Sequence, residues 1–289
     1  MSVPHTATAL VEFVSTRIAE YGITIKPGSR LAVGANAIAS STVETEYGRE
    51  DPRLRSAFEA LRDYSAFDYI LRSPARLALR RGFRQRLETA LKDGADPLQH
   101  GKQTPGRDTQ VELFVAAMLS ASGLDVELGT PDIRTRLDGQ YVYVEAKRPK
   151  SFDGATNALR GAVEQVERTG VPGAVFMDLS LPFSMANEFH TPIIEADPFE
   201  QLHIRKMREA LRPQFRALEA TLADAPIAVV LIQCDWLRRA GKAEWLLESR
   251  IAPLARPSAS LRLLRLRERL YRSIRHSGAG AGRMISMHD

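Results

Sequence analysis

A short stretch near the middle of the chain carries two acids and a lysine in a pattern that can support metal-dependent chemistry. Asp132 precedes the pair Asp138-Gly139, and Glu145 and Lys147 follow it. Asp-Gly between two alternating segments is the strongest short signal for a two-residue β-hairpin turn. With that turn as the loop, Asp132 lies opposite Glu145 with β-carbons about 5 Å apart. Two carboxylates so close repel each other unless a cation lies between them, and oxygen ligands of this kind suit Mg²⁺ or Mn²⁺.

Strand alternation predicts two different faces for this hairpin. The residues expected on the core face are apolar: Ile133, Leu137, Val142, Val144 and Ala146. The other face combines the two acids with Arg134, Arg136, Tyr141, Tyr143 and Lys147. A cation held by the carboxylates can polarise a phosphate group and acidify water, and Lys147 can offset charge that develops in the transition state. The pattern therefore predicts hydrolysis of a phosphodiester.

The elements that must position these residues are predicted from periodicity and turn signals. Around the hairpin we expect, in order, a helix over 108–122, strands over 125–129, 131–137 and 140–147, a helix near 155–169 and a strand over 173–179. Before it we expect helices ending at Gly22, beginning at Asp51-Pro52 and lying near 75–92, with a loop over 34–50. After it we expect a long helix from Asp197 with a kink at Pro213, a buried strand over 226–234 and a helix near 260–275.

These residues and this order resemble the PD-(D/E)xK, restriction-endonuclease-like nuclease superfamily. Pro131-Asp132 followed by Glu145-Ala-Lys147 is similar to its signature, and the superfamily core is helix, three-stranded meander, helix, strand. Members often add an acid from the first helix, which Glu112 resembles, and a glutamine from the second, which Gln165 resembles. The tyrosine that many members carry four residues later is Thr169 here.

The resemblance implies an α/β fold and a metal-dependent nuclease. Glu112, Asp132 and Glu145 would be ligands of Mg²⁺ or Mn²⁺, and Lys147 and Gln165 would complete the catalytic set. The substrate would be nucleic acid, DNA before RNA, in restriction-like defence or repair, and a homodimer is compatible with the resemblance. The core would cover residues 104–237, with a helical module over 1–103 and a basic extension over 238–289.

Composition is compatible with these expectations. The chain has 289 residues, a formal charge of +5 and a pI near 9.5, which suits a polyanionic partner. Arginines are concentrated over 72–86 and 250–283, and 96–107 is the strongest linker candidate. Cys234 is the only cysteine, which excludes an intramolecular disulfide and favours a reducing cytoplasm. The apolar stretches are too short to span a membrane, so we expect no membrane association.

Each of these assignments has a plainer alternative. Glu145 and Lys147 could form an ordinary solvated face, and the fold could be a catalytically inactive nucleic-acid-binding module. An acid in the first turn of a helix, such as Glu112, is favoured by the helix dipole without any catalysis, and Gln165 could be a plain surface residue. Two arginine rows could bind nucleic acid or only be solvated: Arg76, Arg80 and Arg84, and Arg262, Arg265, Arg269 and Arg272.

Overall fold

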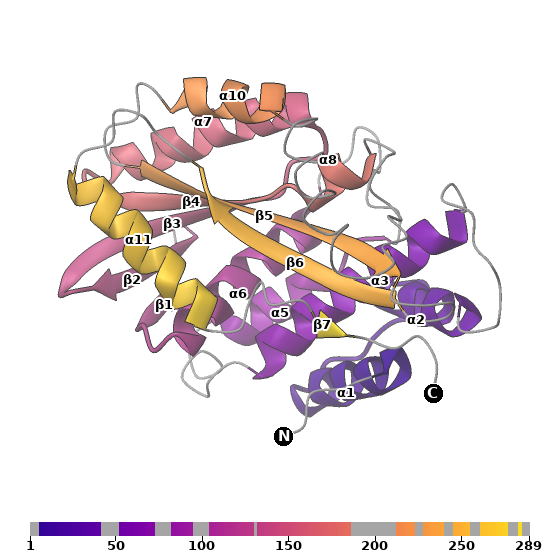
Figure 1. Cartoon of the computed structure of the whole chain (residues 1–289). Helices are drawn as coiled ribbons and strands as arrows, with labels where there is room; N and C mark the ends of the chain where they lie inside the picture. Colours follow the sequence, from indigo (N-terminus) through magenta and orange to yellow (C-terminus); the bar gives the residue numbers. More distant parts are fainter. Residues whose placement is uncertain are drawn as a thin grey trace.

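One mixed β-sheet runs through the molecule, with helices on both of its faces (Figure 1). The computed structural model describes residues 6–41, 52–72, 82–94, 104–129, 132–185, 212–222, 228–239, 245–254, 261–276 and 283–284. Within these residues the sheet has seven strands in the order β1-β2-β3-β4-β5-β6-β7. The fold class is therefore mixed α/β, as the sequence predicts. None of the described helices combines the length and apolar character that crossing a membrane requires.

The strands pair in chain order but change direction in the middle of the sheet. Strands β1, β2 and β3 form an antiparallel meander, β3, β4 and β5 are parallel, and β5, β6 and β7 are antiparallel. Their bounds are Val126–Leu128 (β1), Ile133–Leu137 (β2), Gln140–Lys147 (β3), Gly173–Asp178 (β4), Ala228–Arg239 (β5), Trp245–Pro253 (β6) and Arg283–Met284 (β7). The crossover from β3 to β4 contains a helix, as a parallel connection requires.

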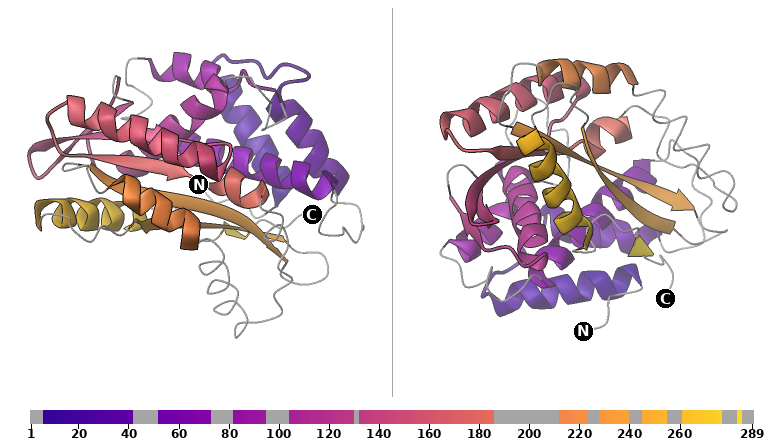
Figure 2. Two further views of the ribbon diagram at one scale, coloured as in Figure 1. Left: turned by 90° about the horizontal axis from the view of Figure 1, so that it is seen from above. Right: turned by 60° about the vertical axis from the view of Figure 1, so that its left-hand side comes forward.

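The helices divide between the two faces. Their bounds are Ala7–Glu20 (α1), Arg30–Ser41 (α2), Pro52–Arg72 (α3), Phe83–Ala90 (α5), Pro105–Ala121 (α6), Phe152–Arg168 (α7), Ser180–Met185 (α8), Arg212–Thr221 (α10) and Leu261–His276 (α11). Helices α7 and α10 pack over one face through Leu159, Val175 and Leu218. A larger apolar cluster on the other face joins α1, α2, α3, α5, α6 and α11 to the sheet. Figure 2 (right) shows α7 and α10 on one side of the strands and α1 on the other.

The elements around the hairpin follow the sequence closely. The predicted helix over 108–122 is α6, the helix near 155–169 is α7, and the strand over 140–147 is β3 with the same bounds. Ile133, Val142 and Val144 are buried in the larger apolar cluster, as alternation requires. The face assignment of the hairpin is therefore confirmed.

Residues 34–41 were expected to form a loop, and that expectation is wrong. They belong to α2, which buries Leu31 and Ile38. The small residues are used for packing: a β-carbon at Gly34 would lie 3.0 Å from the β-carbon of Ala60 in α3. Small residues at a helix crossing allow close approach, which the sequence pattern alone cannot distinguish from a loop.

Several other expectations meet the structure only in part. Of the helix near 75–92, the described part is α5, and Arg76 and Arg80 lie outside the described residues. The long helix from Asp197 also lies outside them up to Arg212, where α10 begins with Pro213 in its first turn. The buried strand over 226–234 is β5, which runs on to residue 239, and the helix near 260–275 is α11. Strand β6 was not predicted.

A buried network of charged side chains lies at the carboxyl ends of β3 and β4. Arg148 directly follows β3, and Asp178 ends β4. Arg62 of α3 donates to Asp178 at 2.9 Å, and Arg148 Nε lies 3.5 Å from the same carboxylate. Glu59 accepts from Arg62 and Arg148, each at 3.2 Å. All four side chains are at most 7% exposed, so the network ties α3 to the end of the sheet.

A second part of this network joins α2, α3 and α6. Arg30 donates to Asp63 at 2.8 Å and to Gln110 at 2.6 Å. Arg107, in the stretch that the sequence marks as a linker, is 1% exposed and donates to the carbonyl oxygen of Gly94 at 2.8 Å. Burial opposes the charge of Asp63, but Arg30 and Arg107 outweigh it and hold its pKa below the ordinary value. These helices are fixed to one another by ion pairs as well as by apolar contact.

Candidate active site

The β2–β3 hairpin closes with the turn that the sequence predicts. Asp138 and Gly139 have φ values of 53° and 78°. Positive φ at both central residues is the mark of a type I′ turn, whose twist matches that of the flanking strands. The register follows: Leu137 pairs with Gln140, and Ile133 with Val144. One residue further out, Asp132 comes opposite Glu145.

Asp132, Glu145 and Lys147 converge at the open end of this hairpin. Lys147 Nζ lies 2.7 Å from Glu145 Oε2 and 3.9 Å from Asp132 Oδ2. Asp132 also accepts a hydrogen bond from the backbone N–H of Ala146 at 3.0 Å. Glu145 is 2% exposed, whereas the side chains of Asp132 and Lys147 are 20% and 27% exposed. The buried acid thus forms the floor of the site, and the other two reach solvent.

Glu112 reaches the same region from α6, but it is held by a partner that the sequence did not point to. Arg86 of α5 forms an ion pair with the Glu112 carboxylate and donates to the carbonyl oxygen of Gly129 at 3.1 Å. Residues 86 and 112 are far apart in the chain, so only the packing of α5 against α6 brings them together. No local pattern could have identified Arg86.

The electrostatics of the site reflect crowded acids. Burial, and next the charge of Asp132, raise the pKa of Glu112 to about 7 despite the opposing Arg86. Burial also raises the pKa of Glu145, against the hydrogen bond from Lys147. Burial opposes the charge of Lys147, but Glu145 and Asp132 outweigh it and raise its pKa. Lys147 is therefore a cation at neutral pH.

The carboxylates of the site are suitable ligands for a divalent cation, but the distances between the acidic side chains are not yet those of a metal site. Carboxylate oxygens are the ligands that Mg²⁺ and Mn²⁺ prefer, and Asp132 and Glu145 share Lys147 as their only common cation in the contacts of the described residues. Within the same residues, no three His, Cys, Asp or Glu side chains already stand close enough together to hold a metal ion. Asp132 and Glu145 fit as a pair, and Glu112 would join them only by leaving Arg86.

Gln165 makes no hydrogen bond or ion pair with the other four candidates in the part of the chain that the structure describes. It is on α7 with an exposed side chain, beside the row that packs on the sheet. The structure therefore brings together Asp132, Glu145 and Lys147 and places Glu112 at their edge, while the role of Gln165 stays a prediction.

Comparison of the chain with protein-family models, curated proteins and solved structures found no match. The functional argument therefore depends on the residues of this chain and their geometry.

Proposed function

We propose that the chain is a metal-dependent nuclease of the PD-(D/E)xK kind that hydrolyses the phosphodiester bonds of DNA with Mg²⁺ or Mn²⁺. The observation that carries the proposal is the convergence of Asp132, Glu145 and Lys147 at one end of the hairpin. Two acids and a cation on one sheet face, with one of the two acids buried, are costly to keep unless they serve a purpose.

The order of elements supports the same proposal. Helix α6, the meander β1-β2-β3, helix α7 and strand β4 follow one another, which is the order that the resemblance implies. The acid and lysine lie at the end of β3, where that strand runs parallel to β4. The site therefore sits at the carboxyl end of parallel strands, where ligands bind in open α/β sheets.

Each residue has a definite role in this reaction. Asp132 and Glu145 would hold the cation, with Glu112 joining them once it is released from Arg86. When bound, the metal would polarise the phosphate and lower the pKa of an attacking water. Lys147 is protonated at neutral pH, as an ordinary lysine is, and its two acids raise its pKa further. It therefore offsets negative charge on the phosphate instead of removing a proton.

A plasmid-nicking assay with Mg²⁺ or Mn²⁺, and EDTA as the control, tests the proposal. Asp132→Asn, Glu145→Gln and Lys147→Met should each abolish nicking, because each removes a ligand or the charge that stabilises the transition state. Glu88→Gln, on the exposed side of α5, is a matched acid-to-amide control and should leave nicking unchanged. Metal-dependent nicking that survives all three site variants would disprove the site.

An inactive nucleic-acid-binding module on the same fold is the second candidate. The ion pair between Arg86 and Glu112 favours this second candidate, because it occupies Glu112, the third of the proposed metal ligands. The two candidates differ in one measurement: the inactive module binds DNA without nicking it under any metal, and binding survives Glu145→Gln. The nuclease nicks DNA and loses that activity with the same change.

A further inference from the structure

The hairpin face that carries the two site acids continues toward the turn as two arginine–tyrosine pairs. Arg134 pairs with Tyr143, and Arg136 pairs with Tyr141 across the strands. We call these four residues the Arg–Tyr track. Successive pairs are about 6.7 Å apart along the strand, so the outer pair lies about 13 Å from the acids. The track and the candidate site are therefore parts of one continuous surface.

The outer end of the track exposes an aromatic ring among cations. Tyr141 is 37% exposed, and only Val33 is comparable among the large apolar side chains of the described residues. The guanidinium carbons of Arg136 and Arg134 lie 4.5 Å and 5.0 Å from the centre of its ring. Arg136 also donates to the Tyr141 hydroxyl, and Arg134 donates to Glu127 at 2.9 Å. These contacts hold flat cationic and aromatic groups in place on an exposed surface.

We propose that the Arg–Tyr track binds a single strand of nucleic acid and leads it to the acids at the open end of the hairpin. The proposal rests on the proposed function, because it names the form of the substrate. Guanidinium groups pair with phosphates, and unpaired bases stack on aromatic rings or on guanidinium planes. In a duplex, neighbouring base pairs cover the faces of each base, so an exposed ring such as that of Tyr141 favours a strand that is already unpaired.

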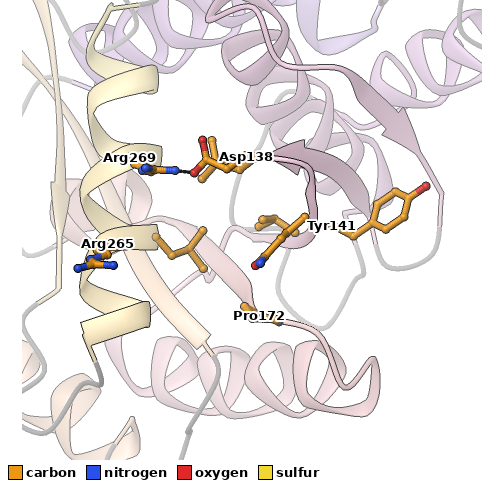
Figure 3. A pocket seen from close by; sticks show the side chains of 9 residues that line it. Asp138, Tyr141, Pro172, Arg265 and Arg269 are labelled. Carbon is orange, nitrogen blue, oxygen red and sulfur yellow. Dashed lines mark ion pairs between the residues drawn. The ribbon is translucent and has the colours of Figure 1, made fainter.

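Positive charge continues beyond the outer end of the track. A cleft of about 360 Å³ separates the hairpin turn from α11, and Asp138, Tyr141, Pro172, Arg265 and Arg269 are among its lining residues (Figure 3). Arg269 forms an ion pair with Asp138, and the Tyr141 ring points away from α11. Arg265 is exposed on the same helix. Helix α11 packs with the core face of the hairpin, so a strand that leaves the track would have to pass around the turn to reach Arg265.

Binding of labelled oligothymidylate, followed by fluorescence anisotropy in EDTA, tests this without cleavage. The wild type should bind it more tightly than a duplex of equal length. Tyr141→Leu should lower the affinity roughly 5- to 100-fold, as the loss of base stacking does, and Tyr141→Phe should retain it. Arg136→Ala should reduce the slope of log affinity against log salt by about 0.7, one phosphate contact on a single strand.

Arg216→Ala, at an exposed position of α10, removes the same charge and should leave slope and affinity as in the wild type. The proposal would be overturned if the wild type bound the duplex more tightly than oligothymidylate, or if Tyr141→Leu and the wild type bound oligothymidylate with equal affinity. The proposal would also be overturned if polyglutamate with the same total charge displaced oligothymidylate, because base stacking would then contribute nothing to binding. If Tyr141→Leu does not fold, the salt slope of Arg136→Ala decides in its place.

The outcomes separate this inference from the nuclease proposal. Oligothymidylate binding that depends on Tyr141, in a protein that cleaves neither plasmid nor oligothymidylate with Mg²⁺ or Mn²⁺, keeps the track and rejects hydrolysis. Nicking that is unchanged by Tyr141→Leu and Arg136→Ala keeps hydrolysis and rejects the track.

Discussion

Arg86 of α5 and Glu112 of α6 form an ion pair at the edge of the candidate site, with side chains that are 28% and 16% exposed. The pair links a helix of the N-terminal third to the helix that begins the predicted core. A metal ion that used Glu112 as a ligand would have to displace this guanidinium. Metal binding and the Arg86–Glu112 contact are therefore expected to compete.

Arg86→Met tests that competition. Without metal, it should lower the melting temperature, because it leaves a partly buried carboxylate without its cation. The gain in melting temperature on adding Mn²⁺ should exceed that of the wild type, since the metal no longer displaces an arginine. Arg84→Met is the matched control: Arg84 is 63% exposed on the same helix and pairs only with Glu88 in the described contacts. Equal Mn²⁺ gains in Arg86→Met and the wild type would contradict the competition.

Asp132→Asn separates a metal ligand from a structural ion-pair partner. The Asn side-chain oxygen can still accept from the Ala146 N–H, as Asp132 does at 3.0 Å, and the change removes repulsion with Glu145. The melting temperature in EDTA should therefore be unchanged or higher. The wild type should gain about 2.7 kcal/mol at a hundredfold excess of metal over its dissociation constant, and the variant should lose most of that gain. The nuclease assignment would be wrong if Asp132→Asn melted several degrees lower than the wild type in EDTA and if neither Mg²⁺ nor Mn²⁺ raised the melting temperature of the wild type.

The raised pKa of Glu112 gives the metal-free protein a defined pH dependence. The unfolded chain releases this proton near 4.5, whereas the folded protein keeps it to about pH 7. Between these values the folded state binds more protons, so the free energy of unfolding falls as pH rises. The loss is on the order of 3 kcal/mol at most, from the size of the shift. Glu112→Gln should flatten this part of the curve in EDTA, as measured by denaturant titration. A curve parallel to that of the wild type would contradict the raised pKa.

The sequence could predict the hairpin because its information is local. Asp138-Gly139 fixes the turn, the turn fixes the register, and alternation then fixes which residues share a face. The convergence of Asp132 with Lys147 follows from those three steps, and the 3.9 Å separation confirms it. Whether the group binds metal or cleaves a phosphodiester stays a prediction.

The rest could not be predicted because it depends on contacts between distant segments. Arg86 contacts Glu112 only when α5 packs on α6. The small residues around Gly34 can be assigned to a helix only once α3 is known to pack against them. Arg107 looks like part of a polar linker until Asp93 and Asp63 surround it. For Gln165 the position in the chain suits the resemblance and the side chain is exposed, so its part in the site stays a prediction.

Asp178 gives the last test, because it compensates two buried arginines at the end of the sheet. Burial opposes its charge, but Arg62 and Arg148 outweigh it and hold its pKa below the ordinary value. Asp178→Asn leaves both guanidinium groups without that charge and should cost about 3–5 kcal/mol of unfolding free energy. Glu88→Gln, which breaks the exposed pair with Arg84, should cost less than about 1 kcal/mol.

The pH dependence of the same variant has a fixed sign. With a lowered folded pKa, the stability from Asp178 is complete above its unfolded pKa and is lost as pH falls through the folded value. The difference in unfolding free energy between the wild type and Asp178→Asn should therefore be largest near neutral pH and shrink in acid. Denaturant titrations across that range measure it. A difference that stays constant down to acid pH would show that Asp178 contributes by packing and by its hydrogen bond to Ser180, and that its charge does not stabilise the buried arginines.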